Sequence, residues 1–353
     1  MSFYTDTFPG RTLMQNGKEY LYFGGTAYLG LQTDAGFQHL FIENVKKYGT
    51  GYSASRKSNV RLSVYEEAET FLSGLAGSEA CITLSSGYLA GQLVSTYFNA
   101  PSYRAFYAPS AHVALHRQST ENYSTFEALR SALLKHIKAQ PDITPVLYFD
   151  TIDPQGQQYP HFNWLQQLPL EKIVLVADDS HGFGITGQEG GGSYNLLKAL
   201  QSKALVVCGS LGKGFGIQGG VIFGSRTFID ALTKTTIFTA SSPAAPCALA
   251  TFVQARSLYA EKRRTLLKNI EVFKEGIQDL SGFRCMEDYP VFSYTDDSLT
   301  GHLYQHHIIV THFSYPGDKA GMVSRIVVSA HHTRSDIIKL VTALNPDPTK
   351  PRC

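Results

Sequence analysis

The chain has 353 residues, of which 43% are hydrophobic and 17% are charged, and its formal net charge is +2 at pH 7. A chain of this length and composition can bury a sizeable core, so we expect one large and one smaller globular domain. The balanced charge gives no electrostatic case for nucleic acid or for an anionic membrane, and neither is expected as a partner.

The N-terminal residues lack a signal pattern, and no apolar run reaches membrane-spanning length, so the expected location is the cytoplasm. The five cysteines are scattered, odd in number and include no Cys-x-x-Cys pair, which argues against a disulfide framework and against a thiolate zinc site. The pairs His306-His307 and His331-His332 have no metal-ligand spacing, so no metal site is expected.

The first half of the chain predicts an α/β domain. Residues 1–27 are expected to form an N-terminal arm with a hairpin at Asn16-Gly17, and apolar spacing predicts helices over 37–48 and 64–75. Short apolar runs then alternate with helical ones, and six of these runs are predicted strands: 81–84, 105–107, 146–149, 173–176, 204–208 and 220–223. This alternation is typical of a mostly parallel sheet covered on both faces, with ligands at the carboxyl ends of its strands.

The second half predicts a smaller α+β domain. Pro243 to Pro246 begin a long helical stretch over about 247–280, which is expected to link a large domain, residues 28–245, to a C-terminal domain, residues 246–353. That domain contains strand-like runs and a final helix near 335–344.

One heptad carries the strongest chemical signal. Ser210-Leu211-Gly212-Lys213-Gly214-Phe215-Gly216 follows the predicted strand over 204–208 directly. The amine of Lys213 can form a Schiff base with a carbonyl compound, and the hydroxyl of Ser210 can hold a phosphate oxygen. The glycines let the backbone pass close to a ligand. This combination indicates pyridoxal phosphate.

Three other interpretations compete for the heptad. The spacing of Gly209 and Gly212 fails the Walker A pattern, in which Gly214 would also have to be Ser or Thr. Gly214-x-Gly216-x-x-Gly219 matches a dinucleotide fingerprint, but a strand-like run follows it where that fingerprint needs a helix. From the heptad alone, an ordinary glycine-rich turn with a solvated lysine stays open.

Polar residues at other strand ends favour the cofactor. Asp178 follows the run over 173–176 and can pair with a protonated ring nitrogen, while His181 can contact a phenolic oxygen; the alternative is an Asp/His pair that caps a turn. Ser86, Gly87 and Tyr88 open a helix whose amides suit a phosphate, or form a plain N-cap.

The same residues, in this order, resemble the α-oxoamine synthase family of fold-type I pyridoxal-phosphate enzymes, with 8-amino-7-oxononanoate synthase and 2-amino-3-ketobutyrate CoA ligase nearest. The likeness runs from about residue 28 to residue 333, and its most specific motifs are 178–182 and 210–216. The resemblance implies a mostly parallel seven-stranded sheet between helices, and a homodimer.

The resemblance also implies roles for individual residues. Lys213 is similar to the lysine that binds the cofactor covalently and removes the substrate α-proton, and His112 is similar to a histidine that stacks on the cofactor ring. With Asp178 and His181 these make the candidate catalytic set. The cofactor-binding set is Ser86, Gly87, Tyr88, His112, Asp178, His181, Ser210, Lys213 and Thr239, the last reaching the phosphate across the dimer interface. Arg325 matches the arginine that pairs with the amino-acid carboxylate, and Ser314 is a second candidate for substrate contact.

The implied activity is condensation of a small amino acid, alanine by family habit, with an acyl-CoA or carrier-bound acyl thioester, with decarboxylation to an α-amino ketone. A pyridoxal-phosphate aminotransferase and a catalytically idle binding protein are the alternatives. The sequence departs from the family pattern near the substrate, where Thr26 replaces an asparagine, and beside the cofactor, where Asp153 stands at the position of an expected serine.

Overall fold

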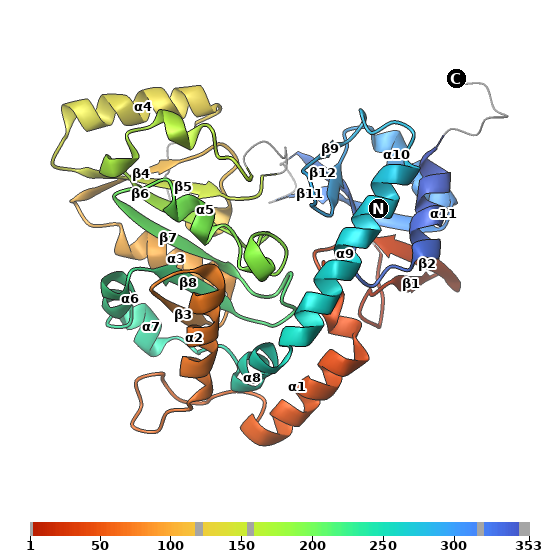
Figure 1. Ribbon diagram of the computed structural model, residues 1–353, viewed down its shortest axis with the longest axis horizontal. Coiled ribbons are helices and arrows are strands. Elements are labelled where there is room, and N and C mark those ends of the chain that lie inside the picture. The colour runs from red at the N-terminus through yellow and green to blue at the C-terminus, as the bar shows by residue number, and fades with distance from the viewer. Residues whose placement is uncertain (1–2, 117–122, 154–158, 316–320, 346–353) are drawn as a thin grey trace. The chain divides into compact units, whose positions relative to one another are not determined.

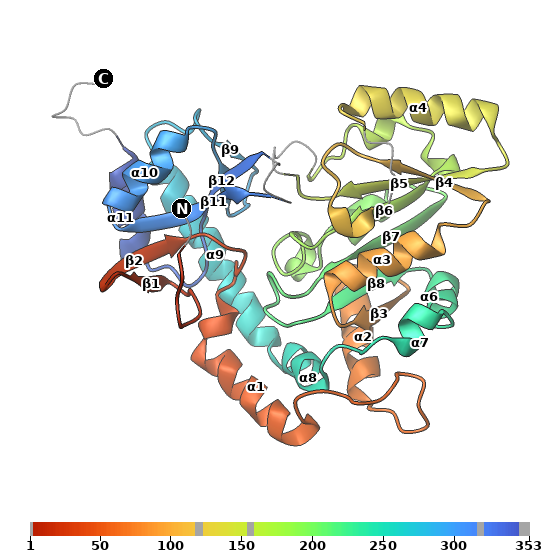
Figure 2. The same cartoon turned by 180° about the vertical axis from the view of Figure 1, so that it is seen from behind.

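The computed structural model describes residues 3–116, 123–153, 159–315 and 321–345. Contacts between residues divide the chain into two units, which Figures 1 and 2 show from opposite sides. Unit 1 contains the described parts of residues 1–38 and 257–353, and unit 2 contains those of residues 39–153 and 158–256. Within the described ranges, no helix is long and apolar enough to cross a membrane.

A six-stranded sheet forms the centre of unit 2. Its strands, in sheet order, are β3 (Ala80–Leu84), β8 (Gly220–Gly224), β7 (Ala204–Ser210), β6 (Val174–Asp178), β5 (Thr144–Asp150) and β4 (Tyr103–Tyr107). Strands β4 to β7 are mutually parallel, and β8 runs antiparallel to both of its neighbours. All six strands predicted from apolar runs are therefore present, and the sheet is mostly parallel as expected.

Helices cover both faces of this sheet (Figures 1 and 2). The helices of unit 2 are α2 (Val64–Ala76), α3 (Gly87–Tyr97), α4 (Phe126–Ala139), α5 (Tyr194–Lys198), α6 (Arg226–Leu232), α7 (Thr236–Ala240) and α8 (Pro246–Gln254), and α1 (Ala35–Tyr48) begins in unit 1. Alternate strand residues such as Val146, Val176 and Ile222 pack in one cluster with Leu93 of α3. Residues between them face the other side, where Phe223 contacts the ring of Tyr194 in α5.

A second six-stranded sheet forms unit 1. Its order is β1 (Thr12–Gln15), β2 (Lys18–Phe23), β11 (Ile308–Ser314), β12 (Met322–Val327), β10 (Val291–Ser293) and β9 (Arg284–Cys285). Only the β2–β11 pair is parallel among these described strands. The helices are α9 (Arg256–Gly276), α10 (Asp297–Gln305) and α11 (Arg334–Leu344), the last begun by a capping box between Thr333 and Asp336.

The N-terminal segment differs from the expected arm. The hairpin forms at Asn16-Gly17, but β2 continues the sheet by pairing with β11, so residues 12–23 belong to unit 1 and contribute Tyr20 to its core. The apolar alternation of this short stretch could be read locally, whereas its partner strand lies almost 300 residues away in the sequence. Helix α8 likewise clusters with unit 2, and Ala255 separates it from α9 where one long helical stretch was expected.

The expected seventh strand of the large sheet is absent from the described residues. It had no apolar run behind it and came only from the family resemblance, so the six strand-like runs account for the whole described sheet. At one edge, β4 pairs only with β5 among the described strands.

Buried polar bonds tie α9 to the loop after β12 in unit 1. Asn269 donates from Nδ2 to the carbonyl oxygens of Ser329 (3.0 Å) and His332 (2.8 Å). The ring of His332 stacks on Phe23 at 3.9 Å between centroids, and its Nδ1 accepts from the Ser329 amide at 3.0 Å. Burial lowers the pKa of His332 to about 4, so the ring is neutral at physiological pH.

Replacing Asn269 with alanine tests this link. We expect Asn269→Ala to lower the free energy of unfolding by about 2–4 kcal/mol, because two buried carbonyl groups lose their side-chain donor. Urea denaturation measures the change, and Lys268→Ala, an exposed neighbour on the same helix, is the control. Equal stabilities of the two variants would contradict the assignment.

Candidate active site

The candidate site lies at the carboxyl ends of three adjacent parallel strands in unit 2. The strand register places Asp150 of β5 opposite Asp178 of β6, and Asp178 opposite Cys208 of β7. Lys213 follows shortly after β7 ends at Ser210. Two carboxyl groups and one amine therefore emerge at the same edge of the sheet, where ligands of such sheets bind.

Lys213 meets His181 at this edge. The Lys213 Nζ lies 2.7 Å from His181 Nε2, which is hydrogen-bonding distance. An ammonium group at this separation is a donor to a neutral imidazole. The two most specific sequence motifs, one carrying the lysine and the other the histidine, are thus joined by a direct side-chain contact.

The glycines near Lys213 serve a purpose that the sequence did not reveal. A Cβ at Gly214 would lie 2.1 Å from the carbonyl oxygen of Phe183, and one at Gly184, whose φ is +82°, would lie 2.9 Å from the carbonyl carbon of Gly214. The lysine loop and the loop after β6 therefore pack backbone against backbone. Sequence reasoning assigned this glycine freedom to close approach of a ligand, which stays a prediction; the structure shows in addition a loop contact that places Lys213 beside His181.

Asp178 presents one carboxylate oxygen to this edge. Its side chain is 6% exposed, and Oδ1 accepts from the Ser180 amide at 2.8 Å. Its Oδ2 lies 3.9 Å from Nδ1 of His112. No lysine or arginine forms an ion pair with Asp178 among the described residues, so this buried carboxylate suits a cationic ligand atom.

His112 follows β4 as the N-cap of a short 3₁₀ turn, Val113–Leu115. Its Nδ1 accepts from the Ala114 amide at 3.2 Å, so in the neutral ring the proton is on Nε2. Burial lowers the pKa of His112, and this outweighs the opposite effect of the Asp178 charge. The ring is therefore a neutral plane beside a carboxylate, as ring stacking requires.

Asp150 is a candidate that sequence reasoning missed. Its Oδ1 accepts from the backbone amide of His112 at 3.2 Å. Burial, and then the charge of Asp178, raise the pKa of Asp150 well above its ordinary value. The available signal was its position directly after the predicted strand over 146–149, since Asp178 was chosen because it follows the predicted strand over 173–176.

Asp179, next to Asp178, faces the opposite way and holds the glycine-rich loop. It is fully buried and accepts from the Thr151 hydroxyl, the Ser193 amide at 2.6 Å and the Ser193 hydroxyl at 3.2 Å. Burial raises its pKa to about 7 in spite of these donors. The two adjacent aspartates therefore have different roles. Asp178 lies at the site, whereas Asp179 holds the loop that contacts Gly214.

The expected phosphate-binding residues converge at the start of α3. Ser86 is the N-cap and accepts from the Leu89 amide at 3.1 Å, which is the plain capping role weighed for it. A Cβ at Gly87 would lie 2.6 Å from the backbone nitrogen of Ser210, so the first turn of α3 packs directly on the end of β7. Tyr88 is 58% exposed. The helix amides and the Ser210 hydroxyl thus lie together, as an anion site needs.

Thr239 lies in the last turn of α7 in unit 2. Its hydroxyl donates to the carbonyl oxygens of Thr235 (3.1 Å) and Thr236 (3.2 Å), and its own carbonyl accepts from the Ser55 hydroxyl at 2.7 Å. These bonds fix Thr239 within its own chain. The expected contact with a partner's phosphate stays a prediction.

The two expected substrate residues belong to unit 1. Arg325 on β12 lies opposite Thr311 of β11, and its buried Nε has no hydrogen-bond partner among the described residues. Its positive charge acts on the hydroxyls of Tyr22 and Tyr28 and lowers their pKa values, though burial raises these pKa values more. Ser314 ends β11, and its hydroxyl lies 3.3 Å from the sulfur of Met322.

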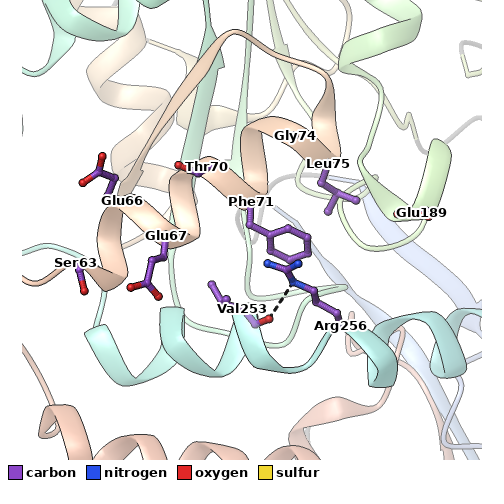
Figure 3. Close-up of a pocket in the computed structure, with 10 residues that line it drawn as sticks. All are labelled: Ser63, Glu66, Glu67, Thr70, Phe71, Gly74, Leu75, Glu189, Val253 and Arg256. Carbon is purple, nitrogen blue, oxygen red and sulfur yellow. Dashed lines mark hydrogen bonds between the residues drawn. The ribbon is translucent and has the colours of Figure 1, made fainter.

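A hollow of about 690 Å³ in unit 2 contains none of these residues. Figure 3 shows it between α2 and α8, with the carboxylates of Glu66 and Glu67 on one side. The guanidinium of Arg256 lies 3.9 Å from the centre of the Phe71 ring and donates to the Val253 carbonyl at 3.2 Å. This cation is thus engaged within the described chain, and the hollow shares no lining residue with the strand-end site.

Comparison with known proteins decides the family. A family model described as Aminotransferase class I and II matches residues 65–344, most of the chain. The chain belongs to the aminotransferase class I and II family. Pyridoxal phosphate is therefore its cofactor, as the motifs predicted, and the chain is a pyridoxal-phosphate-dependent transferase.

Similar proteins narrow the resemblance. The 8-amino-7-oxononanoate synthase of Aeromonas salmonicida is 24% identical over 97% of this chain and 89% of that protein. A serine palmitoyltransferase structure from S. paucimobilis has a TM-score of 0.82 at 18% identity, covering 97% of this chain and 91% of its own. An 8-amino-7-oxononanoate synthase structure from Francisella tularensis has a TM-score of 0.70 at 19% identity, covering 92% and 96%. The fold-type I architecture and the likeness to α-oxoamine synthases are confirmed.

The strand-end residues fit this cofactor. The buried Asp178 oxygen without a cation suits a protonated pyridine nitrogen, and the neutral His112 ring suits stacking. Lys213 supplies the amine, and the start of α3 beside Ser210 supplies donors for a phosphate.

The buried carboxyl of Asp179 makes a pH-dependent contribution to stability. Its pKa is about 7 in the folded chain against an ordinary value of 3.8, so the folded state holds a proton that the unfolded state releases between these values. The stability that this proton provides is full below about pH 3.8 and is lost as the pH rises toward 7. Asparagine mimics the protonated acid and does not titrate.

We therefore expect Asp179→Asn to gain stability relative to the unchanged protein as the pH rises from about 5 to about 8, measured by urea denaturation of the apoprotein. Asp230→Asn, an exposed change on α6, is the control and is expected to follow the unchanged protein. Parallel pH profiles for Asp179→Asn and the unchanged protein would refute the protonated state.

Proposed function

We propose that this chain is an acyltransferase of the α-oxoamine synthase type. It would condense a small amino acid, alanine first, with an acyl thioester, releasing carbon dioxide and the thiol and forming an α-amino ketone. The observation that carries the proposal is the 2.7 Å contact between Lys213 and His181 at the strand ends that also present Asp178 and His112. Similarity to named 8-amino-7-oxononanoate synthases supports the choice within the family.

Each residue has a distinct task in this proposal. Lys213 would hold the cofactor through its Nζ and later take the α-proton of the bound amino acid at the same atom. The bound cofactor supplies an electron sink for the charge left on the α-carbon. Asp178 would keep the cofactor ring an effective electron sink by pairing with its protonated nitrogen. His181 would form a hydrogen bond with the phenolic oxygen of the cofactor.

Arg325 would bind the amino-acid carboxylate. A guanidinium can pair with both carboxylate oxygens at once, and the Nε of Arg325 has no hydrogen-bond partner among the described residues. Ser314 would add a second polar contact on the substrate side. These contacts would fix the orientation of the amino acid, as the reaction needs.

The class of acyl donor is inferred from the reactions for which the relatives are named. The named relatives include both 8-amino-7-oxononanoate synthases and serine palmitoyltransferases, so an acyl thioester is the common co-substrate class proposed here. Thr26 replaces an asparagine that is usual near the substrate, and this change would alter acyl preference before cofactor chemistry. We also propose that the working unit is a homodimer, in which Thr239 reaches the partner's phosphate.

Aminotransfer is the second candidate. The family model that matches the chain is named for aminotransferases, and the first half-reaction needs the same lysine, aspartate and carboxylate-binding arginine. Release of free thiol from an acyl-CoA in the presence of alanine supports acyltransfer, whereas consumption of a keto acid without thiol release supports aminotransfer.

Lys213→Ala is expected to abolish the visible absorption band of the protein–cofactor complex and to lower acyltransfer by about 10²–10⁴-fold or more, because the covalent link and the base are lost together. Absorption spectra with alanine, glycine and serine measure the first effect, and thiol release measures the second. Lys203→Ala removes an exposed lysine just before the other end of β7 and should leave both unchanged. An intact band in Lys213→Ala would refute the assignment.

Arg325→Ala is expected to raise the KM for the amino acid about 10- to 100-fold, the usual effect of losing a hydrogen-bonded charge. Arg325→Lys keeps the charge but loses the planar fork, so an intermediate KM is expected. Steady-state kinetics with alanine measure both. If Arg325→Ala changed only kcat, carboxylate binding would be assigned to another residue.

A further inference from the structure

Asp150 occupies a place in the site that no predicted role uses. It ends β5, in register with Asp178 on the adjacent parallel strand. Its Oδ1 accepts from the His112 amide at 3.2 Å, and the His112 ring lies with Nδ1 3.9 Å from Asp178 Oδ2. The backbone of the stacking histidine is therefore attached to one carboxyl group, while its ring lies beside the other.

The segment that carries His112 leaves the sheet a few residues before His112. It follows β4, and Ala108 still bonds to the carbonyl of Tyr148 at 2.8 Å. The chain then turns through Ser110, whose φ is +62°, before His112 begins the 3₁₀ turn. The bond from the His112 amide to Asp150 fixes the chain directly at the residue whose ring must lie flat.

Two carboxyl groups on adjacent strand ends do not both ionise readily, because like charges at short range repel in a desolvated site. The groups that act on Asp150 are Asp178 on β6, His112 after β4, Lys213 after β7 and Asp153 on its own segment; Cys208 of β7 faces the same pair. Burial and the Asp178 charge together raise the pKa of Asp150, in spite of Lys213 and the His112 amide.

We propose that Asp150 is a positioning residue of the cofactor site: as the uncharged member of the Asp150–Asp178 pair, it holds the His112 ring in place through the backbone amide and leaves Asp178 as the anion for the cofactor ring nitrogen. This inference rests on the proposed function, because it needs His112 and Asp178 to bind the cofactor. It adds a residue outside both specific sequence motifs, and it explains how two acids can lie side by side at the ends of adjacent strands.

The test compares Asp150→Asn, Asp150→Ala and Asp142→Asn with the unchanged full-length protein. The asparagine side chain is neutral and keeps an acceptor for the His112 amide, whereas the alanine side chain has no acceptor. Asp142 is exposed just before the opposite end of β5, so its change to asparagine controls for an altered net charge. The readouts are the dissociation constant for pyridoxal phosphate by protein fluorescence, the circular dichroism of the cofactor band, and the pH midpoint of that band.

We expect Asp150→Ala to weaken cofactor binding about tenfold, as the loss of one buried hydrogen bond would, and to reduce the circular dichroism of the band. Asp150→Asn should keep the dissociation constant, the dichroism and the pH midpoint of the unchanged protein. If Asp150 were instead an anion, its replacement by asparagine would lower the pH midpoint, because the protonated cofactor would lose a nearby negative charge.

A lowered midpoint in Asp150→Asn overturns the proposal, and so does cofactor binding by Asp150→Ala equal to that of Asp142→Asn. Should Asp150→Ala fail to fold, the midpoint of Asp150→Asn still decides the charge state. Failure of the unchanged protein to bind pyridoxal phosphate would instead refute the cofactor site itself, so the two failures are distinguishable.

Discussion

The hydrogen-bond register of three parallel strands is the constraint on which the site depends. Because β5, β6 and β7 run in the same direction, their last residues lie side by side, and the register sets Asp150, Asp178 and Cys208 in one row. A shift of one residue in β6 would send Asp178 to the opposite face of the sheet and bring Asp179 forward. Asp178 and Asp179 would then exchange surroundings, so Asp178 would no longer face the site and Asp179 would lose its bonds to Thr151 and Ser193.

Backbone packing between two loops positions Lys213 at the strand ends that this register aligns. Asp179 holds the glycine-rich loop after β6 through hydrogen bonds from Thr151 and Ser193. The backbone of that loop packs so closely on Gly214 that any side chain at this position would clash with it. The amine of Lys213 consequently reaches His181 at 2.7 Å. A buried acid that faces away from the strand-end site is therefore as important to the lysine's position as the residues that surround it.

Chemistry at the strand ends is separate from the residues expected to select the substrate. The first lies within unit 2, while Arg325 and Ser314 lie on the sheet of unit 1, which the N-terminal hairpin extends. The altered position Thr26 also belongs to unit 1 and stands outside the lysine and aspartate motifs. Such a division lets substrate preference change while the cofactor residues stay as they are, which fits relatives that are named for different products.

Local sequence patterns were enough to predict the six strands of the large sheet and, from the lysine and aspartate motifs, the cofactor, because apolar periodicity and turn residues act over a few neighbouring positions. Three features became visible only in the folded chain: the N-terminal hairpin pairs with β11, the loop after β6 packs against Gly214, and Asp150 accepts a hydrogen bond from the His112 amide. These features depend on which strands pair and in which register, and that choice is made by contacts between residues far apart in the chain, which no local pattern records.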